Sequence, residues 1–373
     1  MTTMAIDKKV LNVPHLRFPE FTERWDTYRI ADILCIGNGR DYKHLSKGDI
    51  PVFGTGGYMT SVNECLYEGE TTFIGRKGTI NKPFYYNGKF WTVDTLFYTH
   101  SFKRVIPKFV YCLFQTINWL RYNEASGVPS LSKDTIEKIK VRIPQLDEQK
   151  KIAKLLSLLD ERIATQNKII EKLESLIRGI RNSLLYSDNG TPIRIGDILK
   201  ERVEKTTVNN QHEILSSTVK GIFSQREYFS KDIASENNAG YKVIRLHDVV
   251  LSPQNLWMGN INYNDHFEVG IVSPSYKIFT IAEKYDKTFI ASMLKTQRSL
   301  YNYMLVSEQG ASIVRRNLNM EAFEQLVFKI PPYEKQCEIG RTMSTLRTRL
   351  AIANATRIAY GQQKQWLLRQ MFI

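Results

Sequence analysis

The feature that most constrains this chain is an internal repeat at an offset of 187 residues. Residues 143–149 read Ile-Pro-Gln-Leu-Asp-Glu-Gln, and residues 330–336 read Ile-Pro-Pro-Tyr-Glu-Lys-Gln. Each motif passes from a strand-like ending through Pro to an acidic residue and Gln. Each is followed by about 38 residues without Pro, which predicts one long helix. Self-similarity at a fixed spacing indicates a duplicated structural unit.

The first Pro-free segment carries a heptad pattern. Its apolar positions step alternately by four and three residues, which keeps one stripe of a helix facing a partner helix. The seam positions are Ile152, Leu156, Leu159, Ile163, Gln166, Ile170, Leu173, Ile177, Ile180 and Leu184. The second segment has an equivalent but weaker seam, interrupted by Arg357 and Lys364. We expect two long helices that pair antiparallel as a coiled coil, with an ordinary amphipathic core helix as the alternative for each.

The segments outside the helices also resemble each other. The matching pairs are residues 28–34 with 193–199, 78–81 with 259–262, and 126–130 with 309–312. Both segments contain short β-branched and aromatic runs broken by Gly, Asn and Asp, which predicts mixed α/β domains. The predicted fold class is therefore α+β, with globular domains at 1–146 and 188–332 and helices at 147–187 and 333–373. Such a duplicated chain predicts a pseudo-two-fold particle.

The charge of the chain favours a polyanionic partner. The net charge is +14 and the pI is near 9.4, and excess Lys and Arg displace counterions from phosphates. Solubility alone is the competing explanation. The four cysteines are scattered and the six histidines form no ligand pattern, so no metal or cofactor is expected. No apolar run is long enough for a membrane span, and residues 1–13 do not resemble a signal peptide, so we expect a cytoplasmic protein.

The order of these features resembles the specificity subunits of type I restriction–modification enzymes. The repeated helix starts carry the resemblance, at residues 144–149 and 331–336. The opening Leu-Arg-Phe-Pro-Glu-Phe of residues 16–21, followed by Trp25, and the stretch from Gly75 to Ile80 also look like the family. The resemblance covers nearly the whole chain.

The resemblance implies two target recognition domains, each reading one half of a split site in double-stranded DNA. It implies that the helices act as a spacer and dock two modification subunits, which carry the adenine methyltransferase chemistry. Restriction motor-nuclease subunits would join that complex. The chain itself would be non-catalytic and would need no membrane.

Candidate DNA-contacting residues lie in loops that combine base-reading and phosphate-binding groups. In the first domain they are Arg40, Tyr42, Lys43, His44, Lys47, Tyr58, Arg76, Lys77, Ser130 and Lys133. In the second domain they are Lys220, Arg226, Gln254, Asn255, Trp257, Arg315, Arg316 and Asn317. Gln254 and Asn255 are the most telling pair, because amides can bond an adenine edge bidentately. For each residue, a solvated surface position is the alternative.

Several enzyme-like patterns lack an essential part. Residues 330–333, Ile-Pro-Pro-Tyr, resemble the catalytic tetrapeptide of adenine methyltransferases, but Ile330 cannot bond the amino group. No Gly-rich cofactor loop is found, and the glycines at 54–57 are not followed by the Lys of a phosphate-binding loop. Two alternatives to a DNA-reading subunit stay open. One is a DNA methyltransferase or nuclease with cryptic motifs, and the other is a coiled-coil adaptor.

Overall fold

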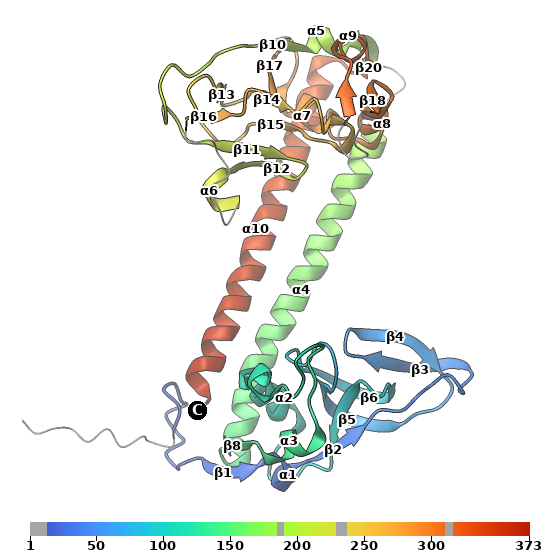
Figure 1. The fold of residues 1–373 in the computed structure, drawn as a ribbon, viewed down its shortest axis with the longest axis vertical. Helices are drawn as coiled ribbons and strands as arrows, with labels where there is room; N and C mark the ends of the chain where they lie inside the picture. Colours follow the sequence, from blue (N-terminus) through green and yellow to red (C-terminus); the bar gives the residue numbers. More distant parts are fainter. Residues whose placement is uncertain (1–12, 185–189, 229–236, 310–315) are drawn as a thin grey trace, which may run out of the picture. The chain divides into compact units, whose positions relative to one another are not determined.

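The computed structural model describes residues 13–184, 190–228, 237–309 and 316–373. The chain divides into two compact units (Figure 1). The first unit comprises residues up to Asn167 together with Ala355–Ile373, and the second comprises Lys168–Asn354. Two helices of 39 residues each, α4 (Leu146–Leu184) and α10 (Tyr333–Met371), contribute to both units. The first unit thus contains the start of α4 and the end of α10, and the second unit contains the remaining halves.

The first unit contains a six-stranded sheet in the order β2-β7-β5-β6-β3-β4. Neighbouring strands are antiparallel except β3 and β6, which are parallel. The strands are β2 (Cys35–Asn38), β3 (Lys47–Gly54), β4 (Gly57–Val62), β5 (Tyr67–Gly75), β6 (Phe84–Thr92) and β7 (Leu96–His100). The helical elements beside the sheet are α2 (Pro107–Thr116), η1 (Trp119–Tyr122) and α3 (Lys133–Lys138).

The second unit contains a four-stranded antiparallel sheet in the order β10-β17-β14-β15. Its strands are β10 (Leu199–Glu201), β17 (Lys277–Ile281), β14 (Val249–Leu251) and β15 (Ile261–Tyr263). Three two-stranded ladders flank it: β11 (Leu215–Thr218) with β12 (Gly221–Ser224), β13 (Lys242–Arg245) with β16 (Val269–Val272), and β18 (Ser307–Gln309) with β19 (Arg316–Leu318). The short helices are α6 (Gln225–Tyr228), η2 (Leu256–Met258), α7 (Lys287–Met293), α8 (Gln297–Leu305) and α9 (Met320–Glu324).

The same framework precedes each long helix. In the first unit, β1 (Asp26–Arg29) leads into the short helix α1 (Ile30–Ile33) and pairs with β8 (Lys140–Ile143). In the second unit, β9 (Thr191–Arg194) leads into α5 (Ile195–Ile198) and pairs with β20 (Val327–Ile330). Both short helices bury two isoleucines. The similarity between residues 28–34 and 193–199 therefore corresponds to a similar local structure, whereas the match at 310–312 falls outside the described residues.

The seam residues of α4 lie on its buried side. Ile152, Leu156 and Leu159 belong to the core of the first unit, and Ile177 belongs to the core of the second. Leu158 and Leu176, which lie off the seam, are about half exposed. The seam thus packs against the globular parts of each unit as well as against the other long helix. The side chain of Leu184 lies outside the described residues.

Lys364 does not interrupt the packing of α10 against α4, contrary to the prediction from the sequence. Its ammonium is buried, pairs with the carboxylate of Asp160 on α4, and lies 5.3 Å from the centroid of the Tyr111 ring. The other interruption, Arg357, is exposed. A second contact between the helices joins the guanidinium of Arg162 to the ring of Tyr360. Within the first unit, α4 and α10 therefore lie against each other through charged as well as apolar side chains.

The opening motif of residues 16–21 is structural. The Arg17 guanidinium donates to both carboxylate oxygens of buried Glu148 on α4, at 2.8 and 2.7 Å. The Leu16 amide donates to the Gln370 carbonyl of α10 at 2.9 Å. Trp25 is buried edge-on against Phe372. This motif fastens the start of the chain to both long helices.

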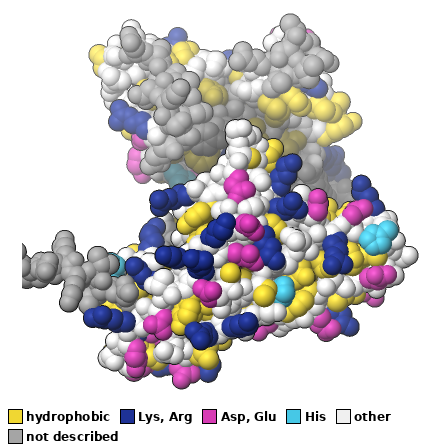
Figure 2. Space-filling view, turned by 60° about the horizontal axis from the view of Figure 1, so that its bottom comes forward, with side chains coloured by type: hydrophobic (Ala, Val, Ile, Leu, Met, Phe, Trp, Pro, Cys, Tyr) yellow, Lys and Arg dark blue, Asp and Glu magenta, His cyan; other side chains and the backbone are white. Residues whose placement is uncertain are grey.

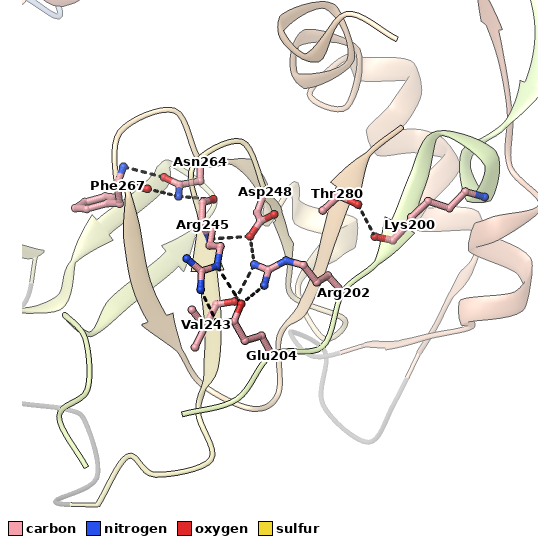
Figure 3. Close-up of polar contacts among 9 residues, drawn as sticks. All are labelled: Lys200, Arg202, Glu204, Val243, Arg245, Asp248, Asn264, Phe267 and Thr280. Atoms are coloured by element: carbon pink, nitrogen blue, oxygen red, sulfur yellow. Dashed lines mark hydrogen bonds and ion pairs between the residues drawn. The ribbon is translucent and has the colours of Figure 1, made fainter. Parts of the chain in front are cut away.

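A charged network joins the segment after β10 to the β13–β14 turn (Figure 3). Arg202 bonds the carboxylates of Glu204 and Asp248, and Arg245 donates to Glu204 at 2.7 and 3.1 Å. The Arg245 amide also donates to Asp248 at 2.6 Å. Asp248 is only 3% exposed, so its charge depends on these donors. The side chains of Arg202 and Arg245 therefore stabilise the fold through these ion pairs.

Candidate nucleic-acid interface

In the first unit, two predicted arginines meet at the turn between β6 and β7. The Arg40 amide donates to the Thr92 carbonyl, and the Arg76 amide donates to the Thr95 carbonyl, both at 2.8 Å. The Arg76 guanidinium also donates to the Asp94 carbonyl at 3.3 Å. Both arginine side chains are exposed. Two cations are therefore held near one turn by backbone hydrogen bonds, an arrangement suited to phosphates or a guanine edge.

The loop that follows β5 meets the loop before α3. The Leu131 amide donates to the Arg76 carbonyl at 2.8 Å, and Lys77 forms an isolated β-bridge with Ser130. Gly78 adopts a φ of 93°, a conformation that favours glycine, and its amide donates to the Pro129 carbonyl of the other loop at 2.8 Å. The structure thus brings Ser130 next to Arg76 and Lys77, which lie far earlier in the sequence.

The remaining candidates of the first unit are more dispersed. Tyr42 is half-buried against Trp91 and Val52, and the His44 ring centroid lies 6.0 Å from that of Trp91. Lys43 and Lys47 are exposed on the loop and strand that follow. The rings of Tyr42 and His44 therefore pack near Trp91 and help to hold the loop in place.

Two further candidates lie on other elements. Tyr58 is 64% exposed on β4, and its hydroxyl contacts that of Ser61 at 3.1 Å. Lys133 begins α3 and forms an ion pair with Glu137 at 3.6 Å. The Tyr58 ring packs edge-on against Phe53 but is mostly exposed, whereas Lys133 already has a carboxylate neighbour.

In the second unit, the predicted residues around η2 meet the start of β19. The Arg316 amide donates to the Gln254 carbonyl at 3.1 Å, and the Arg316 guanidinium lies 4.5 Å from the Trp257 ring centroid. Gln254 is exposed. The Oδ1 atom of Asn255 is buried without a hydrogen-bond partner. Gln254 is therefore the better placed of the two amides to reach a base edge.

The other candidates of the second unit are exposed on separate elements. Lys220 lies in the β11–β12 turn, Arg226 on α6 and Asn317 on β19. Arg315 lies outside the described residues.

Four basic residues, three of them missed by the sequence analysis, line a cavity of about 450 Å³ in the second unit. Arg181 comes from α4, Arg347 from α10 and Lys295 from the segment between α7 and α8, beside the predicted Lys220. The sequence patterns favoured Gly-rich loops, and arginines within a long helix look like its solvated face. The net charge of the chain was the only signal, and it does not locate a residue.

Surface charge alone does not outline an interface. In Figure 2, Lys and Arg side chains are spread over the face that comes forward, with Asp and Glu side chains between them. Among the described residues, no group of three or more His, Cys, Asp or Glu side chains could hold a metal ion. None of the described helices is both long enough and apolar enough to cross a membrane.

A family model matches the first part of the chain. The model described as "Type I restriction modification DNA specificity domain" matches residues 22–175. The chain carries a type I specificity domain. The match covers the first globular domain and most of α4, and it confirms the predicted resemblance to type I specificity subunits. Its description concerns DNA specificity and names no catalytic activity.

Two specificity subunits from Methanocaldococcus jannaschii are similar in sequence to this chain. The MjaVIII subunit is 34% identical over 123 residues, which are 32% of this chain and 27% of that protein. The MjaIX subunit is 28% identical over 178 residues, which are 40% of this chain and 41% of that protein. The chain thus aligns with less than half the length of each of these two type I relatives.

The fold is similar to a solved type I subunit over almost its whole length. The crystal structure of the type I restriction–modification S subunit from M. genitalium has a TM-score of 0.69 and 13% sequence identity. The similarity covers 97% of this chain and 99% of that chain. At this identity the likeness is one of fold, and it extends over both halves of the chain.

Proposed function

We propose that this chain is the non-catalytic specificity subunit of a type I restriction–modification complex. Each of its two globular domains would read one half of a bipartite site in double-stranded DNA. The observation that carries this proposal is a loop of similar conformation that occurs once in each unit. Gly78 and Gly259 share a φ of 93°, and the isoleucine two residues after each, Ile80 or Ile261, is buried.

The residues before each of these glycines are the ones suited to DNA. Arg76 and Lys77 precede Gly78, and Trp257 and Met258 precede Gly259, with Gln254 nearby. In each unit a backbone hydrogen bond ties this loop to a segment near the domain's end, from Leu131 in the first and Arg316 in the second. The two loops thus share a backbone arrangement but carry different side chains. Two half-sites of different sequence would require such a difference, because side chains read the bases.

We propose that α4 and α10 pair antiparallel, separate the two recognition domains and dock two modification subunits. The helix contacts within the first unit support this pairing, and so does the shared core of Ile177, Ile339 and Met343 in the second. Large apolar side chains also face outwards on both helices. Leu158, Leu176, Ile358 and Trp366 are each about half exposed. Exposed apolar side chains on a helix pair are suited to partner subunits.

Reconstitution with the modification subunits of the same system tests the proposal. We expect sequence-specific adenine methylation in the mixture and none with either component alone, followed by cleavage when the restriction motor-nuclease subunits and ATP are added. Methylation at the same sites without this chain would contradict the proposal. Methyl transfer by this chain alone would favour an enzyme.

A further inference from the structure

The cavity in the second unit lined by Arg181, Lys220, Lys295 and Arg347 has an unbalanced charge. We name it the cationic pocket. Its lining contains one carboxylate, that of Asp265, against these four basic groups. Asp265 is exposed and already contacts the ring of His266. Buried charges in proteins are normally paired, because removing an unpaired ion from water costs several kcal/mol.

The hydrogen bonds of these side chains leave their charges uncompensated. Lys295 donates to the carbonyls of Val219 and Gly259 at 3.2 and 2.8 Å. Arg347 donates to the Ser292 hydroxyl at 3.1 Å. All of these partners are neutral. Within the described part of the chain, neither side chain forms an ion pair with a carboxylate.

Arg181 is the least satisfied of the group. Its Nε is buried and has no hydrogen-bond partner. Burial lowers the pKa of Arg181. Burial together with the charge of Arg181 lowers the pKa of Arg347, and the carboxylate of Asp265 opposes this shift only in part. Burial and the two arginines lower the pKa of Lys295 to about 8. These groups therefore repel one another in a partly enclosed space.

We propose that the cationic pocket binds a phosphate group. Guanidinium forks and an ammonium are the groups that bind phosphate oxygens in proteins. An incoming phosphate would pair with Arg181 and relieve the repulsion between it, Lys295 and Arg347. The cavity of about 450 Å³ lies within the range of about 300–1,000 Å³ that small-ligand sites occupy. It therefore has room for a phosphate together with the group that carries it.

Two sources could supply this phosphate. Met258 and Gly259 line the pocket directly after Trp257, and Lys220 is itself a predicted DNA-contacting residue. A phosphodiester of bound DNA is one source, and this source rests on the proposed function. A free phosphate compound is the other.

Thermal unfolding of the full chain at constant ionic strength tests the proposal. We expect sodium phosphate to raise the Tm by about 2–4 °C over sodium chloride, as binding to the folded state requires. Arg181→Met should abolish this increment. It should not lower the Tm in chloride, because the substitution removes a repelling charge. Arg178→Met is the matched control, since Arg178 is exposed one turn earlier on α4, and it should keep the increment.

Duplex DNA distinguishes the sources. If the phosphate belongs to DNA, Arg181→Met should weaken duplex binding and lower its salt dependence by about one phosphate contact. If the phosphate is free, the variant should lose the increment and bind DNA as the wild type does. Wild-type protein that shows the increment but binds no DNA would refute the proposed function alone.

No phosphate-specific increment in the wild type, or an equal increment in Arg181→Met, would overturn the phosphate site. Should Arg181→Met fail to fold, Lys220→Met changes an exposed turn residue of the same pocket. It should raise the phosphate concentration needed for half of the increment. An unchanged concentration dependence would also overturn the site.

Discussion

Gln149 and Gln336, at the same place in the two repeats, form the same hydrogen bond at the start of two different helices. Gln149 donates from Nε2 to the Pro144 carbonyl at 2.8 Å, and Gln336 donates from Nε2 to the Pro331 carbonyl at 2.9 Å. Both side chains are buried. The repeated Gln is therefore a structural part of each helix start, and the repeat reflects a shared way of joining a helix to a domain.

The Oε1 atom of each Gln accepts a hydrogen bond from the backbone amide just before a domain helix, that of Ile106 or Asp286, at 3.0 Å. Gln149→Ala and Gln336→Ala each leave these groups unpaired. Each should lower the free energy of unfolding by about 1–3 kcal/mol. Denaturant unfolding checks this, with exposed Gln145→Ala as the neutral control. A loss at only one of the two glutamines would show that the repeats differ in structural role.

Asp248 should be essential for the stability of the second unit. Asp248→Ala leaves Arg202 partly buried without that carboxylate, and we expect a loss of about 3 kcal/mol in the free energy of unfolding. Asp197 pairs with Lys200 at 4.0 Å on the surface, so Asp197→Ala should cost less than about 1 kcal/mol. Equal effects of the two substitutions would contradict the importance assigned to the network.

Gln254 should determine one half-site only. Gln254→Ala should reduce discrimination at a base pair read by the second domain by about 1–3 kcal/mol, because a base contact is lost. We expect a smaller effect from Asn255→Ala, since the Oδ1 of Asn255 is buried. Sequencing of methylated genomic sites in a reconstituted host measures both. Lys43→Ala and Lys47→Ala should instead weaken binding on all sequences and lower its salt dependence. A change in the other half-site after Gln254→Ala would refute modular reading.

Lys295 should make stability depend on alkaline pH. Its folded-state pKa, about 8, lies below its ordinary value of 10.5. Between these two values the unfolded chain binds a proton that the folded chain lacks, so the free energy of unfolding should rise with pH in that window. The other titratable groups that line the cationic pocket are those of Arg181, Lys220, Tyr263, Asp265 and Arg347. The difference in stability between wild type and Lys295→Met, measured from pH 7.5 to 10, isolates this effect. A difference that stays constant or falls would show that Lys295 keeps its ordinary pKa.

The length of the helices should set the spacer of the DNA site. Deleting residues 166–172 and 353–359 removes one heptad from each helix and shortens each by about 10 Å. At about 3.4 Å per base pair this equals roughly three base pairs. Where methylation survives, both half-sites should stay unchanged while the unread spacer shrinks. Deletion from α4 alone is the control, and it should abolish activity because the helices no longer match. An active double deletion that methylates sites with the original spacer would refute the prediction that helix length sets the spacer.

The sequence predicted the long helices and the shared framework before them, because heptad steps and Pro-bounded helix starts are local signals. It did not predict the partner of Lys364. That charge looked like a break in the seam, yet Asp160, 204 residues earlier, pairs with it. The charge of the cationic pocket was equally hidden, since its groups come from both long helices and two loops. Local patterns describe an element well, but they do not identify the distant residues that complete a site.

The first unit contains residues from both ends of the described chain. Trp25 and Phe109 pack on Phe372, and the Leu16 amide donates to Gln370. During translation these partners are made more than 250 residues apart, with the whole second unit between them. The second unit has all its parts once Asn354 is made. Of these two units, the one whose synthesis starts earlier is therefore the one that can complete its fold only later, and until Phe372 is made the apolar face around Trp25 lacks that cover.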